Sequence, residues 1–245
     1  MMAVLNRFGL VLAGFAALLV SCQQQQQQQF PERVTPLTKE MTPYESFVYH
    51  SKAYPTVMDI YLDHGLLKDA DSKCPIIICL DQQRGRLYVH DQVAADWPVS
   101  TGADDHLTPT GRYRVNFMEK EHYSNRYGKM FDAKGKCIDN NADVFTQKIP
   151  EGGRFEGSAM PNWMRLTYDG IGMHTGKVRA GMRLSHGCIR MPHRISSMLY
   201  DIVKLGTRVV INQQVESNYP VAAVLARRDF EEAIRTQGPE PQEIP

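Results

Sequence analysis

The stretch GMHTGKVRAGMRLSHGCIRM, Gly172–Met191, places two histidines, a serine, a cysteine and four glycines within twenty residues. A thiol attacks a carbonyl carbon well only as the thiolate, and a nearby imidazole can take its proton. Cys188 supplies the thiol, and His174 and His186 are the candidate partners. Gly187 permits a sharp turn that would aim successive N–H groups at one point, where they would stabilise an oxyanion. The stretch therefore has the elements of a nucleophilic site.

Transfer of the thiol proton to an imidazole predicts a thiolate–imidazolium pair at neutral pH. His186 and Cys188 are two residues apart, so an extended strand would put both side chains on one face, whereas a tight turn need not. His174 ends the apolar run GIGM, which indicates a strand edge facing the loop Ser185–Cys188, here called the motif loop. Two other interpretations stay open: a buried structural thiol, and a zinc site of His174, His186, Cys188 and His193, whose spacing fits no standard finger.

Strand signals dominate the chain on both sides of this stretch. The run PIIICL ends at Leu80, Asp81–Gly85 supplies turn residues, and RLYVH resumes at Arg86, so the sequence predicts a hairpin. Alternation and β-branched residues predict a mainly β fold with further strands at Val93–Val99, Arg112–Phe117, Trp163–Thr167, Ile171–His174 and Arg208–Ile211.

Helical periodicity is clear only after the motif. Apolar residues recur at i, i+3, i+4, i+7 and i+8 between Ile195 and Val203, with Pro192 suited to the start of a helix and Gly206 to its end. We expect this helix to pack its apolar stripe under the motif loop. A second helix is predicted over Val221–Thr236, followed by a loose tail.

Residues 118–160 have mixed composition and no clean period. A compact domain seldom holds so much irregular chain unless it forms a lid or a binding wall. We expect this insert to line a substrate cleft, with a decorated surface loop as the other interpretation.

The N-terminus resembles an export signal. Arg7 precedes an apolar run, Phe8–Val20, which is too short to span a bilayer comfortably. LVSC, Leu19–Cys22, resembles a lipoprotein lipobox, which implies that Cys22 is acylated and holds the protein to a membrane. The sequence thus predicts a signal peptide at 1–21, a flexible Gln/Pro-rich tether at 22–43, a lead-in at 44–73, a folded domain at 74–213 and a C-terminal helix and tail at 214–245.

Charge excludes one class of partner. The chain has 28 Lys and Arg against 27 Asp and Glu, so the basic surface typical of nucleic-acid-binding proteins is not expected. The remaining cysteines, Cys74, Cys79 and Cys137, are buried thiols or a disulfide pair, and the sequence does not choose between these. Five histidines lack motif support and are predicted to be surface or loop residues: His50, His64, His90, His106 and His122.

Three motifs together carry a family resemblance. WPVSTGADDHLTPTGRYRV, GMHTG and SHGCIRM, in this order, resemble the catalytic domain of the L,D-transpeptidases (YkuD type) of bacterial cell walls, and the resemblance covers about residues 74–213. It implies a β-sandwich or flattened barrel with a helix after the motif.

The resemblance also implies roles for individual residues. Cys188 would be the nucleophile and His174 its proton acceptor, with oxyanion-hole amides from His186, Gly187 and Cys188. Three further residues would support them. The Ser185 hydroxyl would bond within the motif loop, and the Arg190 guanidinium would bind a carboxylate of the donor peptide. The backbone carbonyl of Thr175 would orient His174.

The implied reaction is acyl transfer from a peptidoglycan stem tetrapeptide through a thioester to an amine of another stem or of a cell-wall-linked protein, with no metal or organic cofactor. Water as acceptor would make the enzyme a carboxypeptidase, and a non-catalytic cell-wall-binding lipoprotein is the other class of function. Inactivation by carbapenems is also implied. The residue after Cys22 is not aspartate, which favours the outer membrane over the inner membrane as the site of an envelope lipoprotein.

Overall fold

The computed structural model describes residues 40–215 and four residues beyond them, Leu225, Arg228, Asp229 and Glu232. The chain divides into two units, Met1–Glu40 and Met41–Pro245, and the fold below is that of the second unit. The predicted signal peptide, Cys22 and most of the tether lie outside the described residues.

The largest sheet has six strands in the order β1-β4-β3-β2-β13-β5. β2 (Ile76–Cys79) and β3 (Arg84–Val89) pair antiparallel, which confirms the predicted hairpin. β4 (Gln92–Pro98) pairs with β3, and β1 (Tyr61–Leu62) forms the edge. On the other side β13 (Arg208–Asn212) runs parallel to β2, and β5 (Gly111–Arg114) closes the sheet antiparallel to β13. β2 is apolar and buried along its whole length, as expected for a strand covered on both faces.

A second sheet carries the stretch that holds the histidines and the cysteine. Its order is β12-β11-β10-β6, with bounds Ile189–Met191, Gly172–Thr175, Trp163–Arg165 and Phe117–Glu119. β11 and β12 run parallel, and the other pairs are antiparallel. The described strands form open sheets, so the mainly β expectation is confirmed without a closed barrel.

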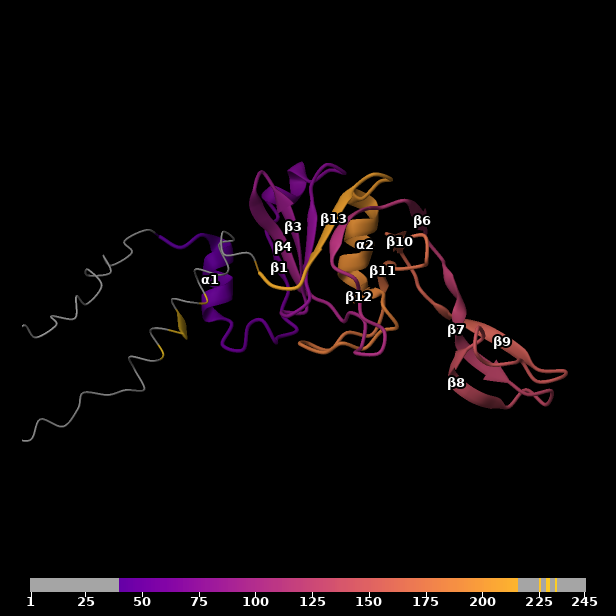
Figure 1. Cartoon of the computed structure of the whole chain (residues 1–245). Helices are drawn as coiled ribbons and strands as arrows, with labels where there is room; N and C mark the ends of the chain where they lie inside the picture. Colours follow the sequence, from indigo (N-terminus) through magenta and orange to yellow (C-terminus); the bar gives the residue numbers. More distant parts are fainter. Residues whose placement is uncertain (1–39, 216–224, 226–227, 230–231, 233–245) are drawn as a thin grey trace, which may run out of the picture. The chain divides into compact units, whose positions relative to one another are not determined.

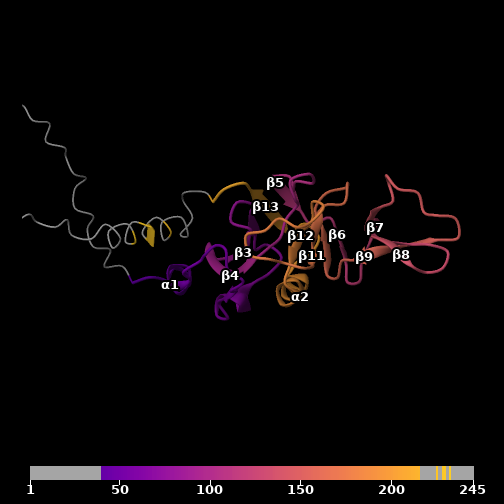
Figure 2. The same ribbon diagram turned by 90° about the horizontal axis from the view of Figure 1, so that it is seen from below.

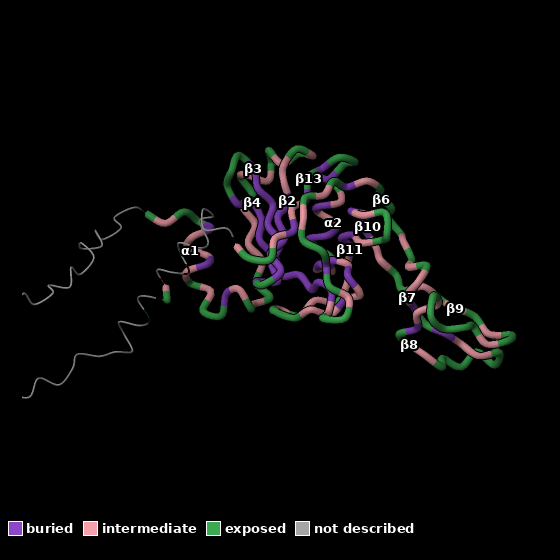
Figure 3. Tube along the Cα trace, viewed as in Figure 1, coloured by how far each residue is buried: buried purple, intermediate pink, exposed green. Residues whose placement is uncertain are grey.

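The predicted helix is α2 (His193–Ile202), and its apolar stripe packs against β11; its predicted place under the motif loop stays a prediction. Ile195 and Leu199 share one buried cluster with Met173 of β11, Ile189 of β12 and residues of the six-stranded sheet, so the core lies between the two sheets and the helix. Figure 2 shows α2 beside β11 and β12, and Figure 3 shows buried chain most extensive on β2, β3 and β4. Pro192 caps the helix as predicted, but the helix ends at Ile202 because Val203 turns to extended backbone.

The insert is not irregular. Residues 118–160 include a three-stranded antiparallel sheet, β8-β7-β9, with bounds Cys137–Asp143, Tyr123–Phe131 and Arg154–Ala159. Figure 1 shows it as a separate element reached through β6 and β10. The prediction of irregular chain was wrong because this sheet buries few side chains, so its strands carry no apolar period.

The lead-in contains helix α1 (Pro43–His50) and the short 3-10 helix η1 (Leu66–Asp69). Tyr44 of α1 donates to Asp96 Oδ2 of β4 at 2.6 Å, and Tyr54 donates to the same oxygen at 2.8 Å. Asp96 also accepts from Arg84 Nε at 2.6 Å and from Arg86 Nε at 2.9 Å. A buried carboxylate thus ties α1 to the six-stranded sheet.

The predicted C-terminal helix lies mostly outside the described residues. The four described positions there are helical, and Arg228 donates to the backbone carbonyls of Ser51 and Tyr54 at 3.3 and 3.1 Å. Among the described residues, no helix has the length and apolar character to cross a membrane.

Candidate active site

Parallel pairing of β11 with β12 decides which side chains share a face. Met173 is opposite Ile189, and His174 is opposite Arg190. Met173 and Ile189 are fully buried toward the core, so His174 and Arg190 point to the other face. Cys188 lies just before β12 and two residues before Arg190, so extended backbone there would carry its side chain to the face that holds His174.

The imidazole of His174 has a fixed orientation. Its Nδ1 lies 2.8 Å from the backbone oxygen of Thr175. Because a carbonyl oxygen only accepts, Nδ1 carries the proton and Nε2 is left as an acceptor. This is the contact predicted for the Thr175 carbonyl, and its part in catalysis stays a prediction. Burial lowers the pKa of His174 from 6.5 to about 4, the Thr175 bond opposes this shift, and the charges of Arg190 and His122 add to it.

The thiol of Cys188 lies against the turn that leads into β11. Its Sγ is 3.5 Å from the backbone oxygen of Gly170, to which the thiol donates. Burial raises the pKa of Cys188, while the Gly172 amide and the charge of Arg190 partly oppose the rise. With the pKa of His174 at about 4, both groups are neutral at pH 7 in the resting structure. Burial thus disfavours both charges of the predicted resting thiolate–imidazolium pair, which counts against that prediction.

The motif loop is shaped by its glycine and its serine. Gly187 has φ +108, and a Cβ there would lie 2.6 Å from Ile171 Cδ1, so glycine is required for both reasons. The Ser185 hydroxyl donates to Cys188 O at 2.5 Å and accepts from Gly187 N at 3.1 Å. The predicted bond of Ser185 within the loop is confirmed.

These bonds change the predicted set of oxyanion donors. The Gly187 N–H is already donated to Ser185, so its predicted place in an oxyanion hole is wrong for this conformation. In residues 40–215, no acceptor is found for the N–H groups of His186 and Cys188. These two amides are the donors that the motif loop keeps available.

The side chain of His186 turns toward the insert rather than toward His174. Its ring stacks on Tyr127 of β7, with centroids 4.1 Å apart and planes 9° from parallel, and the His106 ring meets it edge-on at 4.9 Å. Burial lowers the pKa of His186, and the charges of His106 and Arg190 lower it further. The insert thus reaches the motif loop through Tyr127. His106, predicted as a surface or loop residue, is a loop residue that contacts the motif.

Arg190 is half-buried beside the site. Its Nη1 donates to Leu184 O at 2.9 Å, and a Cβ on Gly176 would lie 2.8 Å from its Cγ. The close pass over Gly176 holds the guanidinium stem along β11. One guanidinium nitrogen of Arg190 is hydrogen-bonded within the protein, so the guanidinium group is oriented before any ligand binds.

Aromatic rings form a wall beside His174. Trp163 of β10 lies 5.8 Å from the His174 ring, and His122 stacks on Trp163 at 5.0 Å and 11°. His122 Nδ1 in turn lies 2.5 Å from Glu119 Oε2. Glu119 is three residues from His122 in the sequence, but Trp163 comes beside them only through the pairing of β6 with β10.

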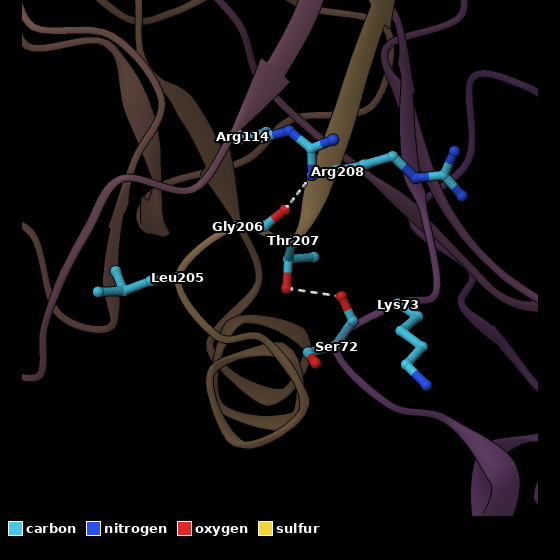
Figure 4. Close-up of a pocket in the computed structure, with 7 residues that line it drawn as sticks. All are labelled: Ser72, Lys73, Arg114, Leu205, Gly206, Thr207 and Arg208. Atoms are coloured by element: carbon cyan, nitrogen blue, oxygen red, sulfur yellow. Dashed lines mark hydrogen bonds between the residues drawn. The ribbon is translucent and has the colours of Figure 1, made fainter.

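The zinc interpretation finds no support in the described part of the chain, where no three His, Cys, Asp or Glu side chains gather as a metal site. Cys74, Cys79, Cys137 and Cys188 are all free thiols there. A separate hollow of about 410 Å³ is lined by Ser72, Lys73, Arg114 and the segment Leu205–Arg208. Figure 4 shows the hydrogen bonds from Arg114 to Gly206 and from Thr207 to Ser72 at this hollow. The hollow includes none of the candidate active-site residues.

Solved structures of known proteins resemble this fold. Three solved structures are similar in fold: an L,D-transpeptidase from Mycobacterium smegmatis (17% identity, 57% of this chain and 58% of that chain, TM-score 0.44), an L,D-transpeptidase (Yku) from Stackebrandtia nassauensis (16%, 69% and 65%, 0.42), and L,D-transpeptidase 3 from Mycobacterium tuberculosis in complex with a faropenem-derived adduct (17%, 58% and 60%, 0.43). This chain thus covers less than two thirds of each of these. No curated protein sequence matches it.

The family comparison covers a larger share of the chain. The model of the L,D-transpeptidase catalytic domain, YkuD, matches residues 75–211, which is more than half of the 245 residues. The matched segment begins just before β2 and ends within β13, so it includes the motif loop, both strands that flank it and helix α2. This chain therefore belongs to the YkuD family of L,D-transpeptidase catalytic domains.

Proposed function

We propose that this protein is a peptidoglycan L,D-transpeptidase that works through a thioester on Cys188. The observation that supports the proposal most directly is the parallel pairing of β11 with β12: His174 lies on β11, Cys188 immediately precedes β12, and Nε2 of His174 is left to accept a proton. The family membership gives this pair a reaction class, acyl transfer.

The first half-reaction breaks one amide bond of the donor. Sγ of Cys188 attacks the carbonyl carbon of the third residue of a stem tetrapeptide, and its proton passes to Nε2 of His174. The tetrahedral intermediate then collapses, the C–N bond breaks, and the imidazolium gives its proton to the leaving terminal D-alanine. The product is a thioester between Cys188 and the shortened stem.

The second half-reaction reverses these proton movements. An amine of another stem, or of a cell-wall-linked protein, attacks the thioester carbon and gives a proton to His174. The C–S bond breaks, and the thiolate takes the proton back. The thioester keeps the energy of the broken amide, so the mechanism uses no metal or organic cofactor.

The neutral resting state fits general-base catalysis. With the pKa of His174 at about 4, the imidazole is unprotonated across neutral pH, so it is ready to accept a proton as the thiol attacks. The negative oxygen of each intermediate would be met by the N–H groups of Cys188 and His186. Arg190 would bind a carboxylate of the donor peptide with the part of its fork that Leu184 does not use.

We also propose that the chain is exported, with residues 1–21 as signal peptide, and anchored to the cell envelope by lipid on Cys22, in the outer membrane where the cell has one. The lipobox-like LVSC sequence supports this. Replacement of Cys22 by Ser should move the protein from the membrane to the soluble fraction. A membrane-bound Cys22→Ser variant would contradict the lipid anchor.

The activity is tested by incubating the protein with a stem tetrapeptide and an amine acceptor. We expect release of D-alanine, and a mass increase of the protein by one imipenem when this carbapenem is added. Cys188→Ala should abolish both, whereas Cys137→Ala, at an exposed thiol, should change neither. Release of D-alanine without a cross-linked product would identify a carboxypeptidase. Neither release nor adduct would leave a cell-wall-binding protein and contradict the proposal.

A further inference from the structure

The motif loop is held by a second loop, Ser100–Thr108, which we call the clasp loop. Ser185 N donates to Thr101 O at 3.0 Å, and Ala103 N donates back to Ser185 O at 2.9 Å. A Cβ on Gly102 would lie 2.9 Å from Gly187 Cα, so the two backbones are in direct contact. The position of the motif loop therefore depends on the clasp loop.

Thr108 makes the contact nearest to the nucleophile. Its side chain is buried, with 3% of its surface exposed. The hydroxyl donates to Gly187 O at 2.7 Å and accepts from Gly102 N at 2.8 Å. The single proton of this hydroxyl is thus committed to the carbonyl that belongs to the same peptide unit as the N–H of Cys188.

Peptide geometry gives this bond a consequence. A trans peptide is planar, and its C=O and N–H point in opposite directions. A carbonyl of Gly187 fixed toward Thr108 therefore fixes the Cys188 N–H toward the opposite side, away from the clasp loop. The next carbonyl, Cys188 O, is held by Ser185 at 2.5 Å. The two peptide units on either side of the Cys188 Cα are thereby fixed. Residues 40–215 offer no acceptor to the Cys188 N–H, which belongs to the first of these units.

We propose that Thr108 is a positioning residue for acyl transfer: its hydroxyl holds the Gly187–Cys188 peptide so that the Cys188 N–H meets the oxygen of the tetrahedral intermediate. The inference rests on the proposed function, because only a reaction at a carbonyl develops charge on an oxygen. Thr108 touches no reacting atom and acts through the amide.

Two reactions of the same thiol separate positioning from general structure. Acylation of Cys188 by imipenem forms an oxyanion, whereas alkylation by iodoacetamide displaces iodide and forms none. Loss of an oxyanion-hole donor typically slows acylation about 10²- to 10³-fold, and a misplaced donor costs less. Removal of the Thr108 hydroxyl should therefore slow acylation about tenfold or more and leave alkylation unchanged.

The experiment compares four variants with the wild-type chain at pH 8.5. Thr108→Val keeps the shape and removes the hydroxyl, Thr108→Ala removes it with a smaller side chain, and Thr108→Ser retains it. Thr110→Val is the matched control, since Thr110 is exposed two residues further on. Circular dichroism and thermal unfolding identify folded variants, and mass spectrometry follows both reactions at Cys188.

The expected result is slow acylation with normal alkylation in the Val or Ala variant, whichever folds, with wild-type rates for Thr108→Ser and Thr110→Val. Wild-type acylation in a folded variant without the hydroxyl would overturn the inference. Equal slowing of both reactions would also overturn it, because it would show a general structural role. A wild-type protein that imipenem does not acylate would instead overturn the proposed function.

Discussion

The ring of Tyr127 lies flat on the imidazole of His186, with centroids 4.1 Å apart and planes 9° from parallel. Tyr127 belongs to β7 of the insert and His186 to the motif loop, so the stack joins the three-stranded sheet to the loop that presents Cys188. An aromatic pair of this kind contributes about 0.5–1.5 kcal/mol beyond its buried area. The insert therefore restrains the motif loop.

Replacement of Tyr127 by Leu should loosen that loop. We expect amide hydrogen exchange in a peptide covering the motif loop to accelerate about two- to twelvefold, as the energy of one aromatic pair implies. Tyr127→Phe keeps the stack and should exchange at the wild-type rate. Tyr168→Leu is the control, because Tyr168 is 88% exposed. Equal acceleration in the Phe and Leu variants would show that the stack does not restrain the loop.

Most of the strands that the sequence predicted are buried, and their apolar residues made them visible. The predicted strand Arg112–Phe117 is an exception, because it is half-exposed and the structure divides it between β5 and the start of β6, in different sheets. β2 and β4 are buried along nearly their whole length, and α2 has a clear apolar stripe because one side faces the core. The strands of the insert differ. Met130 and Ala142 are its buried apolar residues, and Gly128 and Gly157 serve close backbone approach, so no alternation is visible.

Helix α1 did carry a signal. Thr42 and Glu45 form a capping box, in which each side chain bonds the backbone of the other, and Pro43 occupies the first turn. Thr-x-x-Glu followed by apolar residues is a known helix start, although eight residues are too few for a strong period. The helix is stable because Tyr44 reaches the buried carboxylate of Asp96.

The candidate site was predictable where it is local in sequence. Cys188, Ser185 and Gly187 lie in one motif, and His174 lies on the strand that pairs beside it. Protonation states were not predictable, because they depend on burial that only the tertiary structure creates. Contacts to Tyr127, His106 and Thr108 were missed for the same reason, since these residues come from distant segments.

The protonation of Cys188 can be read from its alkylation. Because the pKa of Cys188 is raised by burial, the rate of its reaction with iodoacetamide should climb with pH through the ordinary thiol range, about 8.5, without levelling there. Peptide mass spectrometry distinguishes Cys188 from the other thiols, and glutathione in the same tube is the reference. A rate already constant from pH 6 to 8 would mean a preformed thiolate–imidazolium pair and would contradict the neutral resting state.

Burial of neutral His174 makes the fold sensitive to acid. The pKa of His174 is about 4 in the folded protein and 6.5 when exposed, so the unfolded chain binds the extra proton between these values. Stability from this group is complete above pH 6.5 and is lost as pH falls to 4. A shift of this size corresponds to roughly 3 kcal/mol.

Urea unfolding at pH 7 and pH 4 measures this loss. The free energy of unfolding of the wild type should fall between pH 7 and pH 4. For His174→Gln this fall should be smaller by roughly 3 kcal/mol, because Gln does not titrate. His64→Gln, at an exposed position, should follow the wild-type curve. Parallel curves for wild type and His174→Gln would contradict the burial of a neutral imidazole.

The carboxylate of Asp96 is the counter-charge of two buried guanidinium groups, those of Arg84 and Arg86. Attraction to these groups and the hydroxyls of Tyr44 and Tyr54 hold the pKa of Asp96 below its usual range in spite of burial. Asp96→Asn keeps the shape and removes the charge, which leaves two cations buried without a counter-ion. Breaking a buried pair in this way costs about 3–5 kcal/mol.

We therefore expect Asp96→Asn to lower the free energy of unfolding in urea at pH 7 by about 3–5 kcal/mol, whereas Glu151→Gln, at an exposed carboxylate, should change it by less than about 0.5 kcal/mol. The loss should include detachment of α1, because Tyr44 donates to the same carboxylate. Faster hydrogen exchange in residues 43–50 than in β2 of the variant would show this order of opening. A fully stable Asp96→Asn protein would mean that the hydroxyls and backbone carbonyls around the two arginines suffice to solvate them.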